Sequence, residues 1–430
     1  MRQKTISIHR TLRWALAIML FITYSIISVK KSWNDDFRAY YQAGSVILSY
    51  ANIYDQSIVE GGFLYSPLFA LLMVPLSFLP QLIAATFWYL VNLSSLILSI
   101  AIAIYLSEGS NVSLSTWLKT NLILSHIDRE RKLIIVFVLI LSSRFWLNNI
   151  EHGQVNLIMW CIVLISIVFL RSDRVVIGSA LLGFSVTIKI LPLIFVFYFL
   201  FRKKFNIVLL SFCFLLLFIL IPAAVLGWQH NLNLLEAWFH KIIEPNFTQG
   251  AIGVGDSNQS FPAMLTRFLS QTPANEETGA SVNFLSFSDE TISLIIRLSS
   301  LMFLTVIATI TFSGKKKTIE RENLELSIVF LSAVMMPMLA WKAYFVASIM
   351  GYTVVVSFIL KMNDTPFRRI LITLMIISFI FHTFTSDGLW GWKFAHIFQS
   401  YSCVTFSMIL LYASLILILL KTPDKVIITN

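Results

Sequence analysis

Two adjacent carboxylates, Asp35 and Asp36, follow the first long apolar segment of the chain. Their polar and aromatic surroundings, residues 30–41, contrast with the apolar character of most of the sequence. A carboxylate at the point where a helix leaves a membrane can take a proton from a substrate hydroxyl and still reach a lipid-borne reactant. The alternative is structural, because aspartate is also a common N-terminal cap of helices. The pair therefore predicts either chemistry at a bilayer surface or a helix start.

A second polar group, residues 148–156, separates two apolar runs and contains His152, Gln154 and Asn156. Amides and an imidazole supply the donors and acceptors that hold sugar hydroxyls, and Gly153 permits a close backbone approach. A plain connecting loop would contain the same residue types. A single histidine is more often structural than catalytic, so His152 alone does not decide between the two interpretations.

Three cations accompany these groups. Lys189 lies inside an apolar run, where a lysine costs ~2.5–3.5 kcal/mol and therefore usually has a partner or a task; the alternative is snorkelling to the nearer interface. Arg267 follows Asn258 and Gln259 in a later polar stretch, and its planar guanidinium suits a phosphate; a surface arginine on a short helix is the competing interpretation. Lys342 follows Trp341 at the end of another apolar run.

The elements that position these residues are membrane helices. Of the 430 residues, 57% are hydrophobic and only 13% are charged, whereas a soluble domain has about 25% charged residues. The net charge of +10 lies mainly in short loops between apolar runs, so it indicates membrane orientation and not nucleic-acid binding. We expect an all-α polytopic membrane protein in which residues 1–430 form a single integral membrane domain.

The apolar runs predict about 11–13 transmembrane helices, since each is roughly long enough to cross a hydrocarbon core of ~30 Å. The 175–201 run contains Lys189 and Pro192 and is expected to be bent or split, and the 65–79 run is short and contains two prolines. The runs cover residues 12–29, 65–79, 83–106, 133–147, 155–170, 175–201, 205–228, 291–312, 324–340, 343–360, 368–385 and 397–420.

Basic loops predict the orientation. The N-terminal residues Arg2, Lys4, Arg10 and Arg13, together with residues 202–204 and 315–317, place both termini in the cytoplasm. Two loops then fall outside, residues 31–64 with the carboxylate pair and the long loop 229–290. Simple alternation also puts residues 107–131 outside, although Arg129 and Arg131 argue for the inside. A re-entrant 65–79 segment would remove this conflict.

The ordered strings resemble one family, the polyprenyl-phosphate-hexose-dependent glycosyltransferases of the C-type superfamily, which includes bacterial mannosyltransferases acting on phosphatidylinositol mannosides. No single string is specific, and their shared order carries the resemblance. The strings are Asp36-Phe37 with Tyr40-Tyr41 and Ala43, Ile53-Tyr54-Asp55, Phe63 to Phe69, Gly153-Gln154-Val155-Asn156, Gly178 with Lys189 and Pro192, Asn258-Gln259-Ser260, and Pro337 with Trp341.

The resemblance implies a C-type bundle that moves a hexose, mannose first, from a polyprenyl-phosphate donor to a hydroxyl of a glycolipid or glycan, with inversion. Asp36 matches the family's catalytic base, and Asp35 is its neighbour. The donor phosphate is expected to meet Lys189, Arg267, Lys342 or Arg38. The residues expected to bind sugar or acceptor are Tyr40, Tyr41, His152, Gln154, Asn156, Asn258, Gln259 and Trp341. No metal or cofactor is required. Lys342 is a departure, because the family often has an acidic residue or histidine after this tryptophan.

The same features leave two other classes open. A secondary transporter or lipid flippase would suit many helices with polar residues at mid-depth, but transporters often show internal repeats and this sequence shows none. A non-catalytic membrane scaffold is the third possibility. For the enzyme, we expect a bacterial inner (plasma) membrane location with the active site on the extracytoplasmic face.

Overall fold

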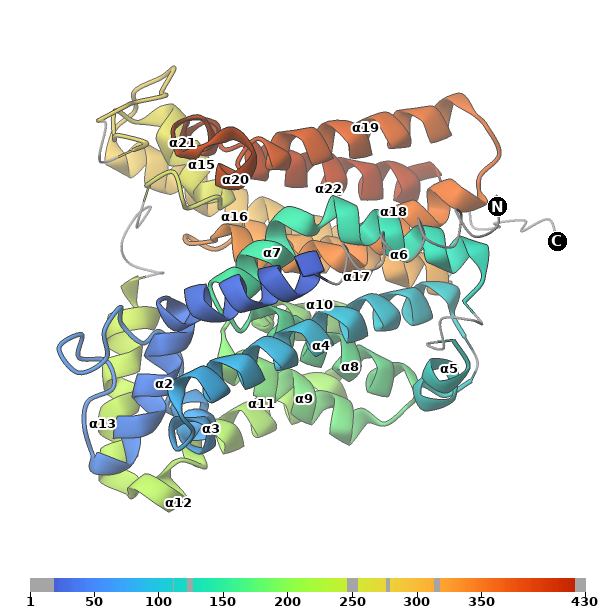
Figure 1. Ribbon diagram of the computed structural model, residues 1–430. Coiled ribbons are helices and arrows are strands. Elements are labelled where there is room, and N and C mark those ends of the chain that lie inside the picture. The colour runs from blue at the N-terminus through green and yellow to red at the C-terminus, as the bar shows by residue number, and fades with distance from the viewer. Residues whose placement is uncertain are drawn as a thin grey trace, which may run out of the picture.

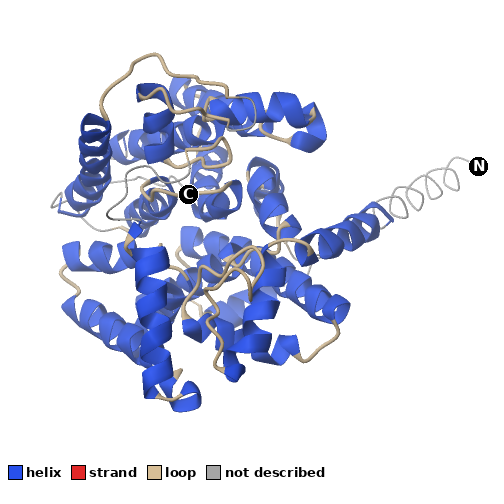
Figure 2. Ribbon diagram, turned by 90° about the vertical axis from the view of Figure 1, so that its left-hand side faces the viewer, coloured by secondary structure: helices blue, strands red, loops and turns tan. Residues whose placement is uncertain are grey.

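The computed structural model is a bundle of helices that run between two ends of the molecule (Figure 1). It describes residues 19–110, 112–121, 127–245, 254–275, 279–312 and 318–421. Within these residues no strand forms, and Figure 2 shows helices joined by loops. The all-α polytopic class expected from composition is confirmed. The basic residues at positions 2–13 and 315–317 lie outside the described residues, as do parts of the 229–290 loop.

The elements have the following bounds. An N-terminal helix is described over residues 19–33. The others are α2 (Asp36–Val46), η1 (Ile47–Ser49), α3 (Pro67–Ser77), α4 (Gln81–Glu108), α5 (Leu114–Asn121), α6 (Arg129–Leu141), α7 (Ser143–Glu151), α8 (Asn156–Arg171), α9 (Val175–Ile188), α10 (Leu193–Phe201), α11 (Phe205–Leu220), α12 (Ala223–Leu226), α13 (Trp228–Trp238), η2 (Phe239–Ile243), α15 (Phe261–Leu269), α16 (Asp289–Phe312), α17 (Ile319–Met335), η3 (Lys342–Ala347), α18 (Ser348–Lys361), α19 (Pro366–Thr383), α20 (Asp387–Trp390), α21 (Trp392–Ser400) and α22 (Cys403–Lys421).

Six of the described helices are long and apolar enough to cross a membrane, or seven if α6 and α7, which meet at 63°, count as one broken span. The expectation of about 11–13 counted every apolar run as a crossing. The shorter helices α8 and α9 also run along the bundle in Figure 1, although each is too short to qualify alone.

The 65–79 run does not cross the bundle. It forms α3, which has only 11 residues and lies beside α2 at one end (Figure 1). We call this the α2 end. The opposite end carries α5, the start of α6 with Arg129 and Lys132, and the turn with Arg202 and Lys204, and we call it the basic end. Because α4 runs from the α2 end to the basic end, the described part of residues 107–131 lies with the other basic segments, and the charge conflict disappears.

The 175–201 run is split, as its Lys189 and Pro192 predict. Helix α9 ends at Ile188, and Lys189 leaves it in an extended conformation, with φ −154° and ψ 137°. Helix α10 then begins after Pro192. The break lies at the α2 end and lets the Lys189 side chain turn toward the carboxylate pair.

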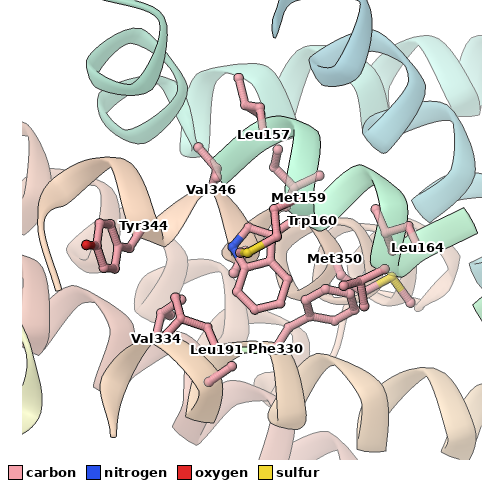
Figure 3. Close-up of a cluster of buried hydrophobic side chains, with 14 of the residues drawn as sticks. Leu157, Met159, Trp160, Leu164, Leu191, Phe330, Val334, Tyr344, Val346 and Met350 are labelled. Carbon is pink, nitrogen blue, oxygen red and sulfur yellow. The ribbon is translucent and has the colours of Figure 1, made fainter. Parts of the chain in front are cut away.

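The core beneath the α2 end is aromatic and aliphatic. Trp160 of α8 and Phe195 of α10 pack on Phe330 of α17, with ring centroids 5.4 and 4.7 Å from it. Tyr344 lies at the edge of this cluster with its hydroxyl pointing away from it (Figure 3). The packed core therefore ends where polar groups begin.

Candidate active site

Asp35 and Asp36 have different roles in the fold. Asp35 is the N-cap of α2, and its carboxylate accepts a hydrogen bond of 2.9 Å from the Asp36 backbone N–H. The helix-cap alternative therefore applies to Asp35. Asp36 is the first residue of α2 and is half-buried, so a substrate can still reach it. Burial and the charge of Asp35 raise the pKa of Asp36 to about 6, which suits a proton acceptor near neutral pH.

Asp35 also holds His152. Its Oδ2 pairs with Nδ1 of His152, and both side chains are about one-third exposed. Burial works to raise the pKa of Asp35, but the hydrogen bond and charge of His152, the Asp36 N–H and Lys31 together hold that pKa below its usual value. Asp35 therefore stays ionised at neutral pH and fixes the imidazole beside Asp36.

A row of side chains connects Lys189 to Asp36. The Lys189 ammonium donates to Oδ1 of Asn156 over 3.0 Å. Nδ2 of Asn156 donates to Oε1 of Gln154 over 2.6 Å, and the Gln154 side chain hydrogen-bonds the Asp36 carboxylate. Because Oε1 of Gln154 is an acceptor here, its amide group is left as the donor to Asp36. The donors all run from the cation toward the carboxylate, which favours ionised Asp36.

Gly153 brings this row against α2. Its φ of +62° lies in the left-handed region, and a Cβ built on it would stand 2.8 Å from Cβ of Phe37 and 2.9 Å from Cβ of Ser32. The carbonyl of Gly153 accepts a hydrogen bond of 2.6 Å from Nε1 of Trp88. Glycine is therefore needed both for the turn and for the close contact that places Gln154 beside Asp36.

Tyrosines enclose the same space. The Lys189 ammonium lies 3.3 Å from the ring centroid of Tyr344 and 5.9 Å from that of Tyr65. The buried Tyr40 shares a hydrogen bond of 2.7 Å with the Tyr65 hydroxyl. These buried rings hold the Lys189 cation in place.

A second group of cations lies next to the carboxylates. Lys31 forms an ion pair of 2.7 Å with Glu151, the residue before His152. The charges of Lys31 and Arg144 both act on Lys342, whose ammonium donates to Gln399 over 2.7 Å. Arg144 donates from Nη2 to the Thr385 carbonyl over 2.7 Å. The three cations form what we call the Lys342 cluster, defined as Lys31, Arg144 and Lys342.

Arg267, Asn258 and Gln259 are built into the fold instead of facing this space. Arg267 is fully buried, and its guanidinium donates to the carbonyls of residues 254, 255 and 258 and to Ser402. Burial lowers the pKa of Arg267 to about 10, so it stays charged. Asn258 and Gln259 are also buried; Asn258 donates to the Met338 carbonyl and Gln259 to the Gln399 carbonyl. Through these hydrogen bonds, the three side chains stabilise the packing of the chain around them.

Three other predicted residues have structural partners as well. Arg38 forms an exposed ion pair of 2.6 Å with Glu60. The Tyr41 hydroxyl donates to the Leu79 carbonyl over 3.0 Å. Trp341 packs against the core and precedes η3, where its carbonyl accepts from the Tyr344 N–H. The structure therefore brings together Asp35, Asp36, Tyr40, His152, Gln154, Asn156 and Lys189, with Lys342 adjacent.

Sequence reasoning missed Arg144 and Tyr65. Arg144 stands inside the 133–147 apolar run, and the cost of a charged residue there is the same signal that singled out Lys189. Tyr65 lies in one of the strings behind the family resemblance, but its role depends on contacts with Tyr40 and Lys189 that no local pattern predicts.

An apolar groove of about 480 Å³ leads away from the site. It lies between the N-terminal helix, α4, α6 and α7, and Leu147 and Ile150 of α7 line it near Glu151. Along α4 it extends from Tyr89 to Ile104, which is roughly 22 Å at 1.5 Å per residue. Its shape and lining suit a lipid chain.

Among the described residues, no three His, Cys, Asp or Glu side chains are grouped so that they could hold a metal ion.

The family model of glycosyltransferase family 87 matches residues 63–381. The match includes Gln154, Asn156, Lys189 and Lys342 and begins after Asp36. No curated protein matched the sequence.

Proposed function

We infer the function from one premise: this chain belongs to glycosyltransferase family 87, a family of C-type membrane glycosyltransferases. Transfer of a sugar is therefore its activity, and the transporter, flippase and scaffold alternatives give way to an enzyme. We propose that it moves a hexose from a polyprenyl-phosphate donor to a hydroxyl of a glycolipid or glycan, with Asp36 as the general base. The resemblance of its strings favours mannose as the hexose.

The reaction begins at the acceptor hydroxyl. Asp36 takes the hydroxyl proton while the oxygen attacks the anomeric carbon, and the bond from that carbon to the phosphate oxygen breaks. Its electron pair leaves with the polyprenyl phosphate, so the anomeric configuration inverts. A positioned base of this kind typically contributes 10²–10⁴-fold. The observation that carries the proposal is the half-buried Asp36 carboxyl with a pKa of about 6 at the end of the row from Lys189.

The leaving group needs cations more than it needs an acid, because it is already a stable anion. We assign this task to Lys342 and Arg144. Helix α7 carries Arg144 and, about one and two turns later, the groove residues Leu147 and Ile150. The polyprenyl tail would then occupy the groove with its phosphate at the Lys342 cluster. Lys189 is already engaged by Asn156 and Tyr344. It orients the side-chain amides of Asn156 and Gln154 and favours the ionised form of Asp36.

The position of the basic end indicates which end of the bundle faces the cytoplasm. Arginine and lysine accumulate in cytoplasmic loops and next to helix ends, and the start of α6 at residues 129–132 and the turn at residues 202–204 lie at the basic end. We therefore propose that the α2 end faces the extracytoplasmic side of a bacterial inner membrane. Nucleotide sugars belong to the cytoplasm, so a lipid-linked donor suits a site on that face.

The test is transfer in membranes supplied with a labelled polyprenyl-phosphate hexose. Asp36→Asn removes the base and keeps the size of the side chain, so transfer should fall by about 10²-fold or more. Asp55→Asn is the matched control, because Asp55 is an exposed carboxylate in the same 31–64 loop and should leave transfer unchanged. Full transfer by the Asp36→Asn protein would show that Asp36 is not the base. Substrate uptake by proteoliposomes without sugar transfer would favour transport instead.

A further inference from the structure

A cavity of about 480 Å³, lined by charged as well as apolar side chains, lies at the basic end, far along the bundle from the active site. It opens between two helical turns, one joining α8 to α9 and the other joining α10 to α11. Four basic and two acidic side chains line it, so positive charge is in excess. These charged residues are Arg171, Arg202, Lys203, Lys204, Asp173 and Glu322.

The two turns have the same backbone geometry. Asp173 and Lys203 take φ values of +57° and +56°. The N–H of Arg174 then donates to the Phe169 carbonyl over 2.9 Å, and the N–H of Lys204 donates to the Phe199 carbonyl over 2.9 Å. Each turn therefore reverses the chain in the same way and starts its next helix at the cavity.

Helices α9 and α11 consequently present their N-termini together. Both are long enough to have a dipole, with 14 and 16 residues, and they pack closely, because a Cβ on Gly183 would stand 2.8 Å from the Ser211 carbonyl oxygen. The N-caps are Arg174 and Lys204, whose side chains have donors only, so no side chain caps the first N–H groups of either helix. Free N–H groups and a partial positive charge at two adjacent N-termini favour an anion.

The cationic side chains at the cavity retain unused donors. Arg202 is 9% exposed and pairs with Glu325 over 2.6 Å, yet its buried Nε has no hydrogen-bond partner. Arg171 pairs with Glu322 over 3.5 Å. Within the described part of the chain, no ion pair or side-chain hydrogen bond involves Lys203 or Lys204. Glu325 therefore holds Arg202 rigid at the cavity, and the ammonium groups of Lys203 and Lys204 supply the free donors, a set of cations that suits a phosphate.

We propose that this cavity binds a phosphate group at the basic end, held by Lys203, Lys204, Arg202 and the N-termini of α9 and α11. The phosphate comes either from the headgroup of an anionic lipid or from solution. Helix α9 begins at this cavity and ends at Ile188, directly before Lys189, so the bound phosphate fixes the helix that positions Lys189. The site is separate from the sugar-transfer site, and its occupancy is measured without any transfer assay.

The experiment uses the full-length protein in nanodiscs of phosphatidylcholine, with and without phosphatidylglycerol, and follows lipid binding and thermal unfolding. The test variant is Lys203→Gln/Lys204→Gln, at two exposed positions. The matched control is Arg129→Gln/Lys132→Gln, which removes two exposed charges from the same end outside the cavity. A third arm adds inorganic phosphate to phosphatidylcholine nanodiscs.

Phosphatidylglycerol should raise the unfolding temperature of the wild type and of the control variant, and the Lys203→Gln/Lys204→Gln protein should bind it about tenfold more weakly. If inorganic phosphate alone gives the same rise, the site takes soluble phosphate; if only the lipid does, it takes a headgroup. Equal loss of affinity in the two double variants would overturn the site, because it would indicate general surface attraction. No response to either anion would overturn it as well.

Discussion

Lys189 is joined to Asp36 by the side chains of only two residues, Asn156 and Gln154, with every donor directed toward the carboxylate. The cation and the base come from distant parts of the chain, α9 and α2. The positive charge of Lys189 lowers the pKa of Asp36, while burial and Asp35 raise it. The resulting value of about 6 leaves Asp36 mostly ionised at neutral pH, so transfer should fall as the pH drops below 6.

Replacing Lys189 should shift this pH dependence upward. Lys189→Met removes the opposite charge, which raises the pKa of Asp36 by about one unit. The acid limb of kcat/KM should then move from near pH 6 toward pH 7, and transfer at pH 6.5 should fall about threefold from this cause. The measurement is the pH profile of transfer from a labelled polyprenyl-phosphate hexose.

Lys189→Arg is the control, because it keeps a positive charge and should keep the acid limb close to that of the wild type. An equal loss of transfer at every pH in the Lys189→Met protein, with the acid limb unmoved, would contradict the link to Asp36 and leave Lys189 with a packing role.

Replacing Asp35 should shift the acid limb of the pH profile of transfer to lower pH. Asp35→Asn removes the negative charge that raises the pKa of Asp36, and asparagine still caps a helix well. The acid limb should move below pH 6 while α2 stays intact. The same pH profile measures it, with far-UV circular dichroism as the check on helix content. A limb that moves upward or stays in place would show that Asp35 does not tune Asp36.

The sequence allowed the membrane helices and the separate carboxylate pair to be predicted, because long apolar runs and their charged interruptions are local signals. The 81–108 helix, for example, was expected over 83–106. Arg267 could not be predicted in the same way, because its partners include Ser402, a contact 135 residues away. The 63° bend between α6 and α7 was also not expected, because no proline marks it and the serine pair at the bend, Ser142-Ser143, lies inside the 133–147 apolar run. It is this bend that directs Arg144 and Glu151 to the site.

The Lys342 cluster should control donor binding. Lys342→Gln and Arg144→Gln each remove a charge proposed to contact the donor phosphate, so the KM for the donor should rise about tenfold with a smaller change in KM for the acceptor. Initial rates at varied donor and acceptor concentrations separate the two.

Lys393→Gln serves as the control for these variants, because Lys393 is an exposed cation at the same end of the bundle and should leave both KM values unchanged. Unchanged donor KM in the Lys342→Gln and Arg144→Gln proteins would move the phosphate elsewhere, with Lys189 as the remaining buried cation near Asp36.

A bulky side chain placed in the apolar groove should weaken the use of a long-chain donor more than that of a short-chain donor. Ile97 lines the groove and is 54% exposed, so Ile97→Trp adds a ring there without disturbing the packed core. Leu90 lies on the same helix, is 52% exposed and is not part of the groove lining, which makes Leu90→Trp a matched control. The Ile97→Trp protein should show a higher KM for a long-chain polyprenyl-phosphate hexose and nearly normal kinetics with a short-chain analogue, because only the long tail reaches as far as position 97. Equal effects of the two tryptophans, or an equal effect on both donors, would place the tail outside this groove.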